Sequence, residues 1–290
     1  MVQIDKLHFG YTRKRPLFTN LDLQLLPGNI YGLLGKNGAG KTSLLKLIAG
    51  LVFPWEGQCM VNGFESRKRI PECLADICLI PEEYHLPSVR ISRYVSLNAP
   101  FYERFDHEKL AWLLKEFQLN PEQKINQLSF GQKKKFLLAF GLSTSARLLL
   151  MDEPTNGLDI PSKSQFRRVI AASLNEEQSV VISTHQVRDL ESLIDPVIII
   201  DEGRIIFQQS LEAISSSLLF ETLPEIKENK QPIYYEEALG GYAAIIPNNE
   251  TKETKMDLEL LFNGVVANAN GVNKAFQQTE LNEKHDNSLL

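Results

Sequence analysis

The spacing of hydrophobic residues changes several times along the chain, and each change predicts a different element. Residues 2–9 and 17–26 alternate apolar and polar side chains, as half-buried strands do. Short, almost wholly apolar runs predict buried strands at 31–34, 77–80, 148–151 and 180–182. Helical spacing follows residue 41, spans 110–117 and returns at 133–140 and after 161. This alternation predicts an α/β core with a mostly parallel sheet, preceded by an antiparallel hairpin.

Two further changes of pattern divide the chain into parts. From residue 84 to about 146 the spacing is helical, which predicts a helical subdomain inserted into the core. Beyond residue 209 the chain becomes acidic, with 13 Asp and Glu but 6 Lys and Arg over 210–290. The sequence there predicts a hairpin turning at Gly240-Gly241 and a helix from Asp257. We therefore expect one α/β domain over 1–209 and a small acidic α+β extension over 210–290.

Aromatic residues are frequent in the predicted helical subdomain. We expect most of them in its core and a minority at a docking surface. They are Tyr94, Phe101, Tyr102, Phe105, Trp112 and Phe117. The sequence leaves the role of the acidic extension open between regulation, support of a dimer and added stability.

Composition limits the classes of protein that the chain can represent. No apolar run approaches the roughly 18–20 residues that span a bilayer. The start of the chain has neither the basic residues nor the apolar core of a signal peptide, so we expect a cytoplasmic protein. The net charge of −5 argues against nucleic acid as a partner. The three cysteines show no zinc spacing and are expected to be reduced thiols.

The clearest chemical signal is the run G-K-N-G-A-G-K-T over residues 35–42, between a buried strand and a helix. Glycines let backbone N–H groups wrap a phosphate, and the helix adds its positive end. Lys41 is expected to reach the β- and γ-phosphates, and the Thr42 hydroxyl to ligate Mg²⁺. The alternative is a glycine-rich turn with a solvated lysine. The residues predicted to contact the nucleotide here are Gly35, Asn37, Gly38, Ala39, Gly40, Lys41, Thr42 and Ser43.

A phosphate-binding loop alone also fits kinases, GTPases and motors. The class of protein is therefore decided by the motifs in the second half of the chain. That half holds L-S-F-G-Q at 128–132, a buried strand ending in Asp152-Glu153, a loop reaching Asp159, and Ser183-Thr184-His185. In this order the motifs resemble the ATP-binding cassette (ABC) family of ATPases, over about residues 1–209. The resemblance implies a P-loop NTPase core with a RecA-like, mostly parallel sheet. An N-terminal antiparallel β subdomain and an inserted helical subdomain complete the implied fold.

The resemblance implies a role for four residues around one nucleotide. Tyr11 lies where the family places an aromatic ring against adenine, although it could instead cap the hairpin turn. Asp152 resembles the carboxylate that holds Mg²⁺, and Glu153 resembles the general base that activates water. His185 resembles the histidine that contacts the γ-phosphate. The expected catalytic set is therefore Glu153, His185 and Lys41.

Further residues are implied to act across a dimer. Ser129, Gly131 and Gln132 resemble the signature that binds the γ-phosphate held by the opposite subunit, and Asp159 resembles the residue that signals between sites. Two copies, or this chain and a paralogue, would then meet head-to-tail around two ATP molecules. The lysines at 133–135 lie near a helix N-terminus, where cations are disfavoured unless a phosphate arrives. A solvated basic face is the alternative for them.

Two positions depart from the family pattern. Phe130 replaces a glycine of the signature. Glu82 stands where a glutamine that touches Mg²⁺ and the membrane partner is usual, and a carboxylate there could still ligate Mg²⁺.

The implied function is an ATPase that uses ATP and Mg²⁺ and powers a bacterial exporter through separate transmembrane permease subunits. The chain would then sit on the inner face of the cell membrane through those partners. The segment from Glu82 to Pro87 is the expected contact. The alternative is a soluble ABC ATPase that acts on ribosomes or DNA, although the chain lacks the second cassette or long coiled coil typical of such members. A regulatory binder without hydrolysis is a third reading.

Overall fold

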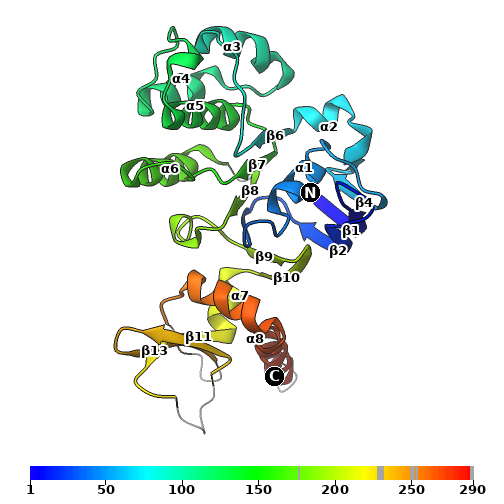
Figure 1. The fold of residues 1–290 in the computed structure, drawn as a ribbon, viewed down its shortest axis with the longest axis vertical. Helices are drawn as coiled ribbons and strands as arrows, with labels where there is room; N and C mark the ends of the chain where they lie inside the picture. The colour runs from blue at the N-terminus through cyan, green and yellow to red at the C-terminus, as the bar shows by residue number, and fades with distance from the viewer. Residues whose placement is uncertain (176, 227–231, 249–251, 253, 288–290) are drawn as a thin grey trace.

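The computed structural model describes residues 1–287 apart from 176, 227–231, 249–251 and 253. A six-stranded sheet runs through its centre in the order β10-β9-β3-β8-β7-β6 (Figure 1). All neighbours in it pair in parallel except β9 and β10. Its strands are β3 (Ile30–Leu34), β6 (Ile77–Ile80), β7 (Leu148–Asp152), β8 (Ser179–Thr184), β9 (Val197–Asp201) and β10 (Arg204–Gln209). The predicted parallel core is confirmed.

A second, antiparallel sheet covers one side of this core. It has the order β2-β1-β4-β5 and contains β1 (Val2–Phe9), β2 (Phe18–Leu25), β4 (Glu56–Val61) and β5 (Phe64–Glu65). Helix α1 (Lys41–Ile48) contacts both β4 and β7, so it lies between the two sheets. Leu44 and Leu45 of α1 are fully buried in one cluster with Ile4 of β1 and Leu148 of β7. Burial from both sides fixes the start of α1, and with it the loop that precedes the helix.

Helices gather at the β6 edge of the central sheet (Figure 1). They are α2 (Pro71–Ala75), α3 (Ile91–Asn98), α4 (His107–Glu116) and α5 (Phe130–Ser143). Leu113 of α4 is buried in one cluster with Phe136 of α5, and Tyr94 and Phe140 meet edge to face. Most of the predicted core aromatics pack into this cluster, whereas Phe101 and Trp112 are 72% and 40% exposed. The exposed aromatics of this set are therefore these two residues, and their place in a docking surface stays a prediction.

The described residues after β10 build a three-stranded antiparallel sheet and further helical segments, with a kink at Asn268 in the last of them. The sheet has the order β11-β13-β12, from β11 (Leu218–Leu223), β12 (Tyr234–Ala238) and β13 (Gly241–Pro247). Helix α7 (Leu211–Ser217) precedes it and α8 (Leu258–Asn287) follows it. The hairpin at Gly240-Gly241 and the helix after Asp257 are confirmed. Phe276 of α8 packs edge to face on Phe207 of β10, which ties this part to the central sheet.

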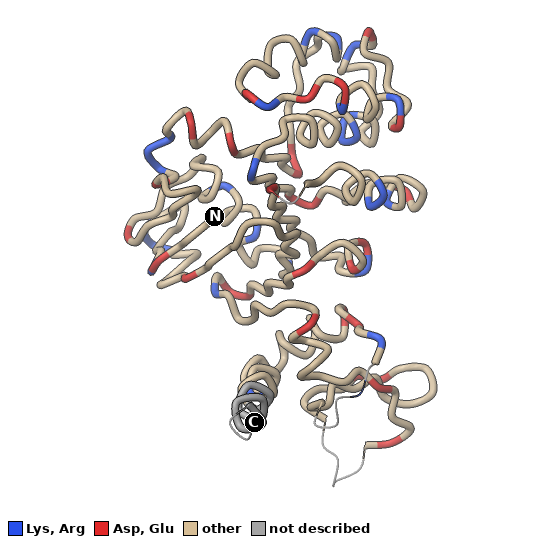
Figure 2. The backbone as a smooth tube through the Cα atoms, turned by 180° about the vertical axis from the view of Figure 1, so that it is seen from behind, with Lys and Arg blue, Asp and Glu red and all other residues tan. Residues whose placement is uncertain are grey.

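Charged residues lie mainly in the loops and helices around the central sheet, and few lie on its strands (Figure 2). Two of the exceptions, Asp152 and Asp201, stand at the ends of their strands. Within the described part of the chain, no helix combines the length and hydropathy needed to cross a bilayer.

Candidate functional site

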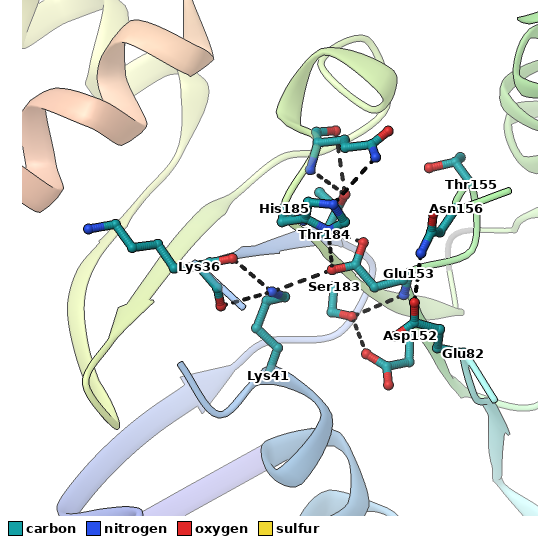
Figure 3. Close-up of polar contacts among 12 residues, drawn as sticks. Lys36, Lys41, Glu82, Asp152, Glu153, Thr155, Asn156, Ser183, Thr184 and His185 are labelled. Carbon is teal, nitrogen blue, oxygen red and sulfur yellow. Dashed lines mark hydrogen bonds and ion pairs between the residues drawn. The ribbon is translucent and has the colours of Figure 1, made fainter. Parts of the chain in front are cut away.

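The predicted site residues meet at the carboxyl edge of the central sheet. The loop from Gly35 to Gly40 leaves β3 there, Asp152 ends β7, and His185 directly follows β8. Because these strands are parallel neighbours, their carboxyl ends meet at one edge of the sheet. Residues far apart in the sequence are thereby brought within hydrogen-bond distance (Figure 3). Ligands of open α/β sheets commonly bind at this edge.

The glycine-rich loop has the geometry of an anion cradle. Gly38 and Gly40 have φ of 81° and 112°, values that side-chain-bearing residues rarely adopt. A Cβ on Gly40 would also lie 2.6 Å from the buried ring of Phe18, so the loop needs glycine there for two reasons. No side chain caps the N-terminus of α1, which leaves its first N–H groups available to a phosphate.

A cleft of about 570 Å³ opens over this loop. Eight of the predicted nucleotide-contacting residues line it, together with Glu153. They are Tyr11, Asn37, Gly38, Gly40, Lys41, Thr42, Ser43 and Glu82. Gly35 and Ala39 shape the loop from behind, since Gly35 backs onto Ile200 and Ala39 is buried. Five lining residues were not predicted: Thr12, Arg15, Pro16, Leu17 and Lys36.

The Lys41 ammonium lies between the loop and the Glu153 carboxylate. Its Nζ donates to the carbonyl of Gly35 at 2.7 Å and to that of Lys36 at 3.3 Å, and lies 3.4 Å from Glu153 Oε1. The side chain of Lys41 is 7% exposed and that of Glu153 is 6% exposed. A buried ammonium with a carboxylate and two carbonyls around it keeps its charge compensated. The alternative of a solvated lysine on a glycine-rich turn is therefore wrong.

Two hydroxyl-bearing side chains, one of them that of cleft-lining Thr42, hydrogen-bond to the Asp152 carboxylate. Thr42 Oγ1 donates to Asp152 Oδ2 at 2.7 Å, and Ser183 Oγ donates to Asp152 Oδ1 at 2.5 Å. Asp152 is only 3% exposed, and its two oxygens are oriented by these hydroxyls. Mg²⁺ prefers oxygen ligands such as carboxylates and hydroxyls, so the side chains of Thr42 and Asp152 suit such an ion chemically.

Glu82 lies on the cleft wall in the loop after β6. Its Oε1 accepts a hydrogen bond from Asn156 Nδ2 at 2.7 Å (Figure 3). The structure thus ties Glu82 to the loop that follows Glu153, a contact that the sequence did not predict.

Glu153 and His185 form a direct pair. The ring Nδ1 of His185 lies 2.9 Å from Glu153 Oε1, and the backbone N–H of His185 donates to Oε2 at 3.4 Å (Figure 3). The backbone of Glu153 is strained, with φ of 45°, and its N–H donates to Ser183 O at 3.1 Å. A buried, oriented carboxylate held in an unfavourable conformation is typical of functional positions.

Tyr11 contacts both the hairpin turn and the cleft. Its ring meets Phe9 edge to face at 5.3 Å, and its hydroxyl lies 3.1 Å from Ser43 Oγ on the first turn of α1. The side chain nevertheless remains 65% exposed where it lines the cleft. Packing against the turn and presenting a face to a base are therefore compatible here.

The signature residues and Asp159 lie outside this cleft. Ser129 caps α5 and forms a reciprocal capping box with Gln132, with bonds of 3.2 and 2.9 Å. Asp159 caps helix α6 (Ile160–Ser173) through the N–H of Ser162 at 2.9 Å, and hydrogen bonds from Ser162 lower the pKa of its carboxyl. None of the four predicted dimer residues lines the cleft of its own chain. That dimer contact remains a prediction.

Lys134 is the residue that sequence reasoning misplaced. It is only 1% exposed, so neither a solvated basic face nor a lysine awaiting phosphate describes it. Its Nζ donates to the main-chain carbonyls of Glu153 and Asn156 at 2.6 and 2.8 Å. Helical spacing was the available signal, since Lys134 shares a face with buried Leu137 and Leu138.

Comparison with known proteins shows which proteins this chain resembles in sequence. The ABC transporter family model matches residues 18–156. The ABC transporter ATP-binding protein NatA of Bacillus subtilis is 30% identical over 218 residues, which are 73% of this chain and 89% of that protein. The lantibiotic transport ATP-binding protein SrtF of Streptococcus pyogenes is 29% identical over 231 residues, 76% of this chain and 99% of the relative.

A solved structure shares the fold. It is the dimeric post-hydrolysis state of the ATP-binding cassette MJ0796 bound to ADP and Pi. It aligns with a TM-score of 0.64 at 22% identity, over 73% of this chain and 99% of that one. The P-loop NTPase fold expected from the motifs is thereby confirmed.

Proposed function

Because this chain belongs to the ABC transporter family as one of its ATP-binding proteins, we propose that it hydrolyses Mg²⁺-bound ATP to drive export of a substrate. The observation that carries this proposal is the Glu153 carboxylate, which is buried and shared between Lys41 and His185. That carboxylate stands at the cleft above the phosphate-binding loop, where a general base for water is needed.

Different residues around the cleft would bind the phosphates, the base and the Mg²⁺ ion of the nucleotide. The N–H groups of the loop and the first turn of α1 would hold the phosphates, and Tyr11 would cover the base. Thr42 and Asp152 would hold Mg²⁺, with Glu82 as a further oxygen donor at the same wall. Bound there, the ion would offset phosphate charge.

Glu153 would take the proton of the attacking water. His185 orients its carboxylate through Nδ1, and Lys41, which lies against the phosphate-binding loop, would stabilise negative charge on the phosphates. The strained backbone of Glu153 is consistent with a position selected for geometry over stability.

One chain supplies only half of the proposed catalytic site. Ser129, Gly131, Gln132 and Asp159 lie outside the cleft, on the N-terminal ends of α5 and α6. We propose that they meet the nucleotide of a second subunit, either another copy or a paralogue. ATP binding would close this head-to-tail dimer, and hydrolysis would reopen it.

Separate transmembrane permease subunits would receive this motion. A relative named as a Nod factor export ATP-binding protein supports the export direction. We propose the segment from Glu82 to Pro87 as the contact, with the chain held at the inner face of the membrane by its partners. We also propose residues 1–209 as the nucleotide-binding domain, about 84–146 as its helical subdomain, and 210–290 as an accessory extension.

The experiment that tests this function uses two variants as baits in detergent-solubilised membranes of the native cell. Glu153→Gln with Mg²⁺ and ATP should retain a multi-span membrane protein. Lys41→Ala lacks the ammonium that we expect to bind the phosphates, so it should retain less of that membrane protein. Recovery of ribosomes or DNA with both baits, and no membrane protein, would establish the alternative soluble ATPase instead.

A further inference from the structure

A lysine side chain lies fully buried one turn from the signature motif. Lys134 belongs to α5, whose first residues are Phe130 and Gly131, and it is among the largest side chains with almost no solvent exposure. Removing an ammonium from water is unfavourable unless partners compensate the charge. Its position therefore requires an explanation, which its contacts supply.

The partners of Lys134 are main-chain carbonyls, and both lie in the loop after β7. Nζ donates to Glu153 O at 2.6 Å and to Asn156 O at 2.8 Å. The Phe130 ring adds a cation–π contact at 5.9 Å. Burial lowers the pKa of Lys134 to about 8, and the carboxylates of Glu82, Glu153 and Asp152 oppose that shift.

The first of these bonds restrains Glu153, the proposed general base for hydrolysis. The N–H of Glu153 donates to Ser183 O, and its carbonyl accepts from Lys134, so both neighbouring peptide groups are fixed. Left-handed φ is unfavourable for a non-glycine residue, so bonds from outside the loop help to maintain it at Glu153.

The second bond extends the same restraint to Glu82. Lys134 holds the carbonyl of Asn156, and the amide of Asn156 donates to Glu82 Oε1 at 2.7 Å. One ammonium thus connects α5, the loop after β7 and the loop after β6. Tyr84 adds a second link between the loop after β6 and α5, because its ring stacks on Phe130 at 5.9 Å and its hydroxyl donates to the Phe130 carbonyl.

We propose that Lys134 is a positioning residue for hydrolysis, which holds Glu153 in its strained conformation and links it to the helix that carries Ser129 and Gly131. This inference rests on the proposed function. Since Lys134 and Gly131 are one helical turn apart, a shift of α5 on docking of a second subunit would reach the Glu153 carbonyl directly.

The test compares Lys134→Met with Lys109→Met. Lys109 is a matched control, because its Nζ also donates to a backbone carbonyl, that of Ser173 at 3.1 Å, far from the cleft. Lys134→Met should lower kcat about 10- to 100-fold, the range of lost charge-assisted hydrogen bonds, while KM and calorimetric ATP affinity change little. Lys109→Met should leave kcat unchanged.

Several results of this comparison would decide whether Lys134 positions Glu153. A kcat of Lys134→Met near the wild-type value overturns the proposal, as does an equal loss of kcat and ATP affinity, which would indicate general damage. If Lys134→Met does not fold, Lys134→Gln, which keeps a donor without the charge, is held to the same criteria. Absence of hydrolysis by the wild-type protein, or full activity of Glu153→Gln, would refute the underlying function instead.

Discussion

Replacing His185 with alanine tests whether the Glu153 carboxylate needs an oriented partner. The imidazole supplies one contact of 2.9 Å to Oε1, and the backbone N–H of residue 185 supplies a longer one to Oε2 that the substitution keeps. After the change, the Lys41 ammonium at 3.4 Å is the remaining side-chain partner of Oε1 among the described residues, and we expect the nucleotide to engage that ammonium too.

The magnitude follows from the exposure of the pair. A hydrogen bond to a charged group contributes about 1.5–3 kcal/mol. The His185 side chain is 31% exposed, so water can replace part of the contact and the lower end of that range applies. About 1.5 kcal/mol corresponds to roughly a tenfold loss of kcat, and a share in contacting phosphate would add to it.

The assay is steady-state phosphate release at saturating ATP, with KM determined in parallel. His185→Gln keeps a donor and should recover part of the loss. His107→Ala is the control, because His107 packs on Phe105 in the helical segment and lies outside the cleft. A kcat for His185→Ala equal to that of the control would refute the assigned role.

Three further predictions concern neighbouring groups. Lys41→Ala should weaken ATP binding about 10- to 100-fold by titration calorimetry, because charge-assisted contacts to phosphate are lost, and an unchanged affinity would contradict this. Glu82→Gln, which can still accept from Asn156, should hydrolyse ATP nearly as the wild type does, whereas Glu82→Ala should need more Mg²⁺ for half-maximal rate; equal Mg²⁺ curves would exclude Glu82 as an ion ligand. Burial lowers the pKa of Lys134 to about 8 from 10.5, so kcat should fall as pH rises through about 8, when the ammonium facing Glu82, Asp152 and Glu153 loses its charge. Over the same range the unfolded chain holds more protons at Lys134 than the folded chain does, so the contribution of Lys134 to folding stability rises with pH. A drop in Tm parallel to the loss of kcat would show that unfolding causes the loss.

The fold was predictable where short-range pattern determines it. The run 35–42 requires a strand before it and a helix after it, and Gly38 and Gly40 adopt the positive φ that the motif demands. Asp106 caps α4 through the N–H of Lys109, three residues later in the chain. Such features depend on neighbours within a few residues, so they can be read without tertiary information.

Features that depend on long-range packing could not be read in this way. Lys134 is buried because its partners are carbonyls 19 and 22 residues later, and nothing local identifies those acceptors. The bond between Asn156 and Glu82 joins loops after two neighbouring strands, so it exists only once β6 and β7 pair. Likewise, the packing of Phe276 on Phe207 reveals where α8 lies, whereas its sequence shows only a helix.

The most direct test of the account is ATP turnover by Glu153→Gln at saturating Mg²⁺ and ATP. The substitution keeps the shape of a buried side chain but removes the basic carboxylate, so turnover should fall about 10²- to 10⁴-fold. ATP should still bind, and an ATP-dependent species of twice the monomer mass should accumulate in size-exclusion chromatography with light scattering if the partner is a second copy. Turnover near the wild-type rate would contradict the assignment of Glu153 as the base and, with it, the proposed mechanism.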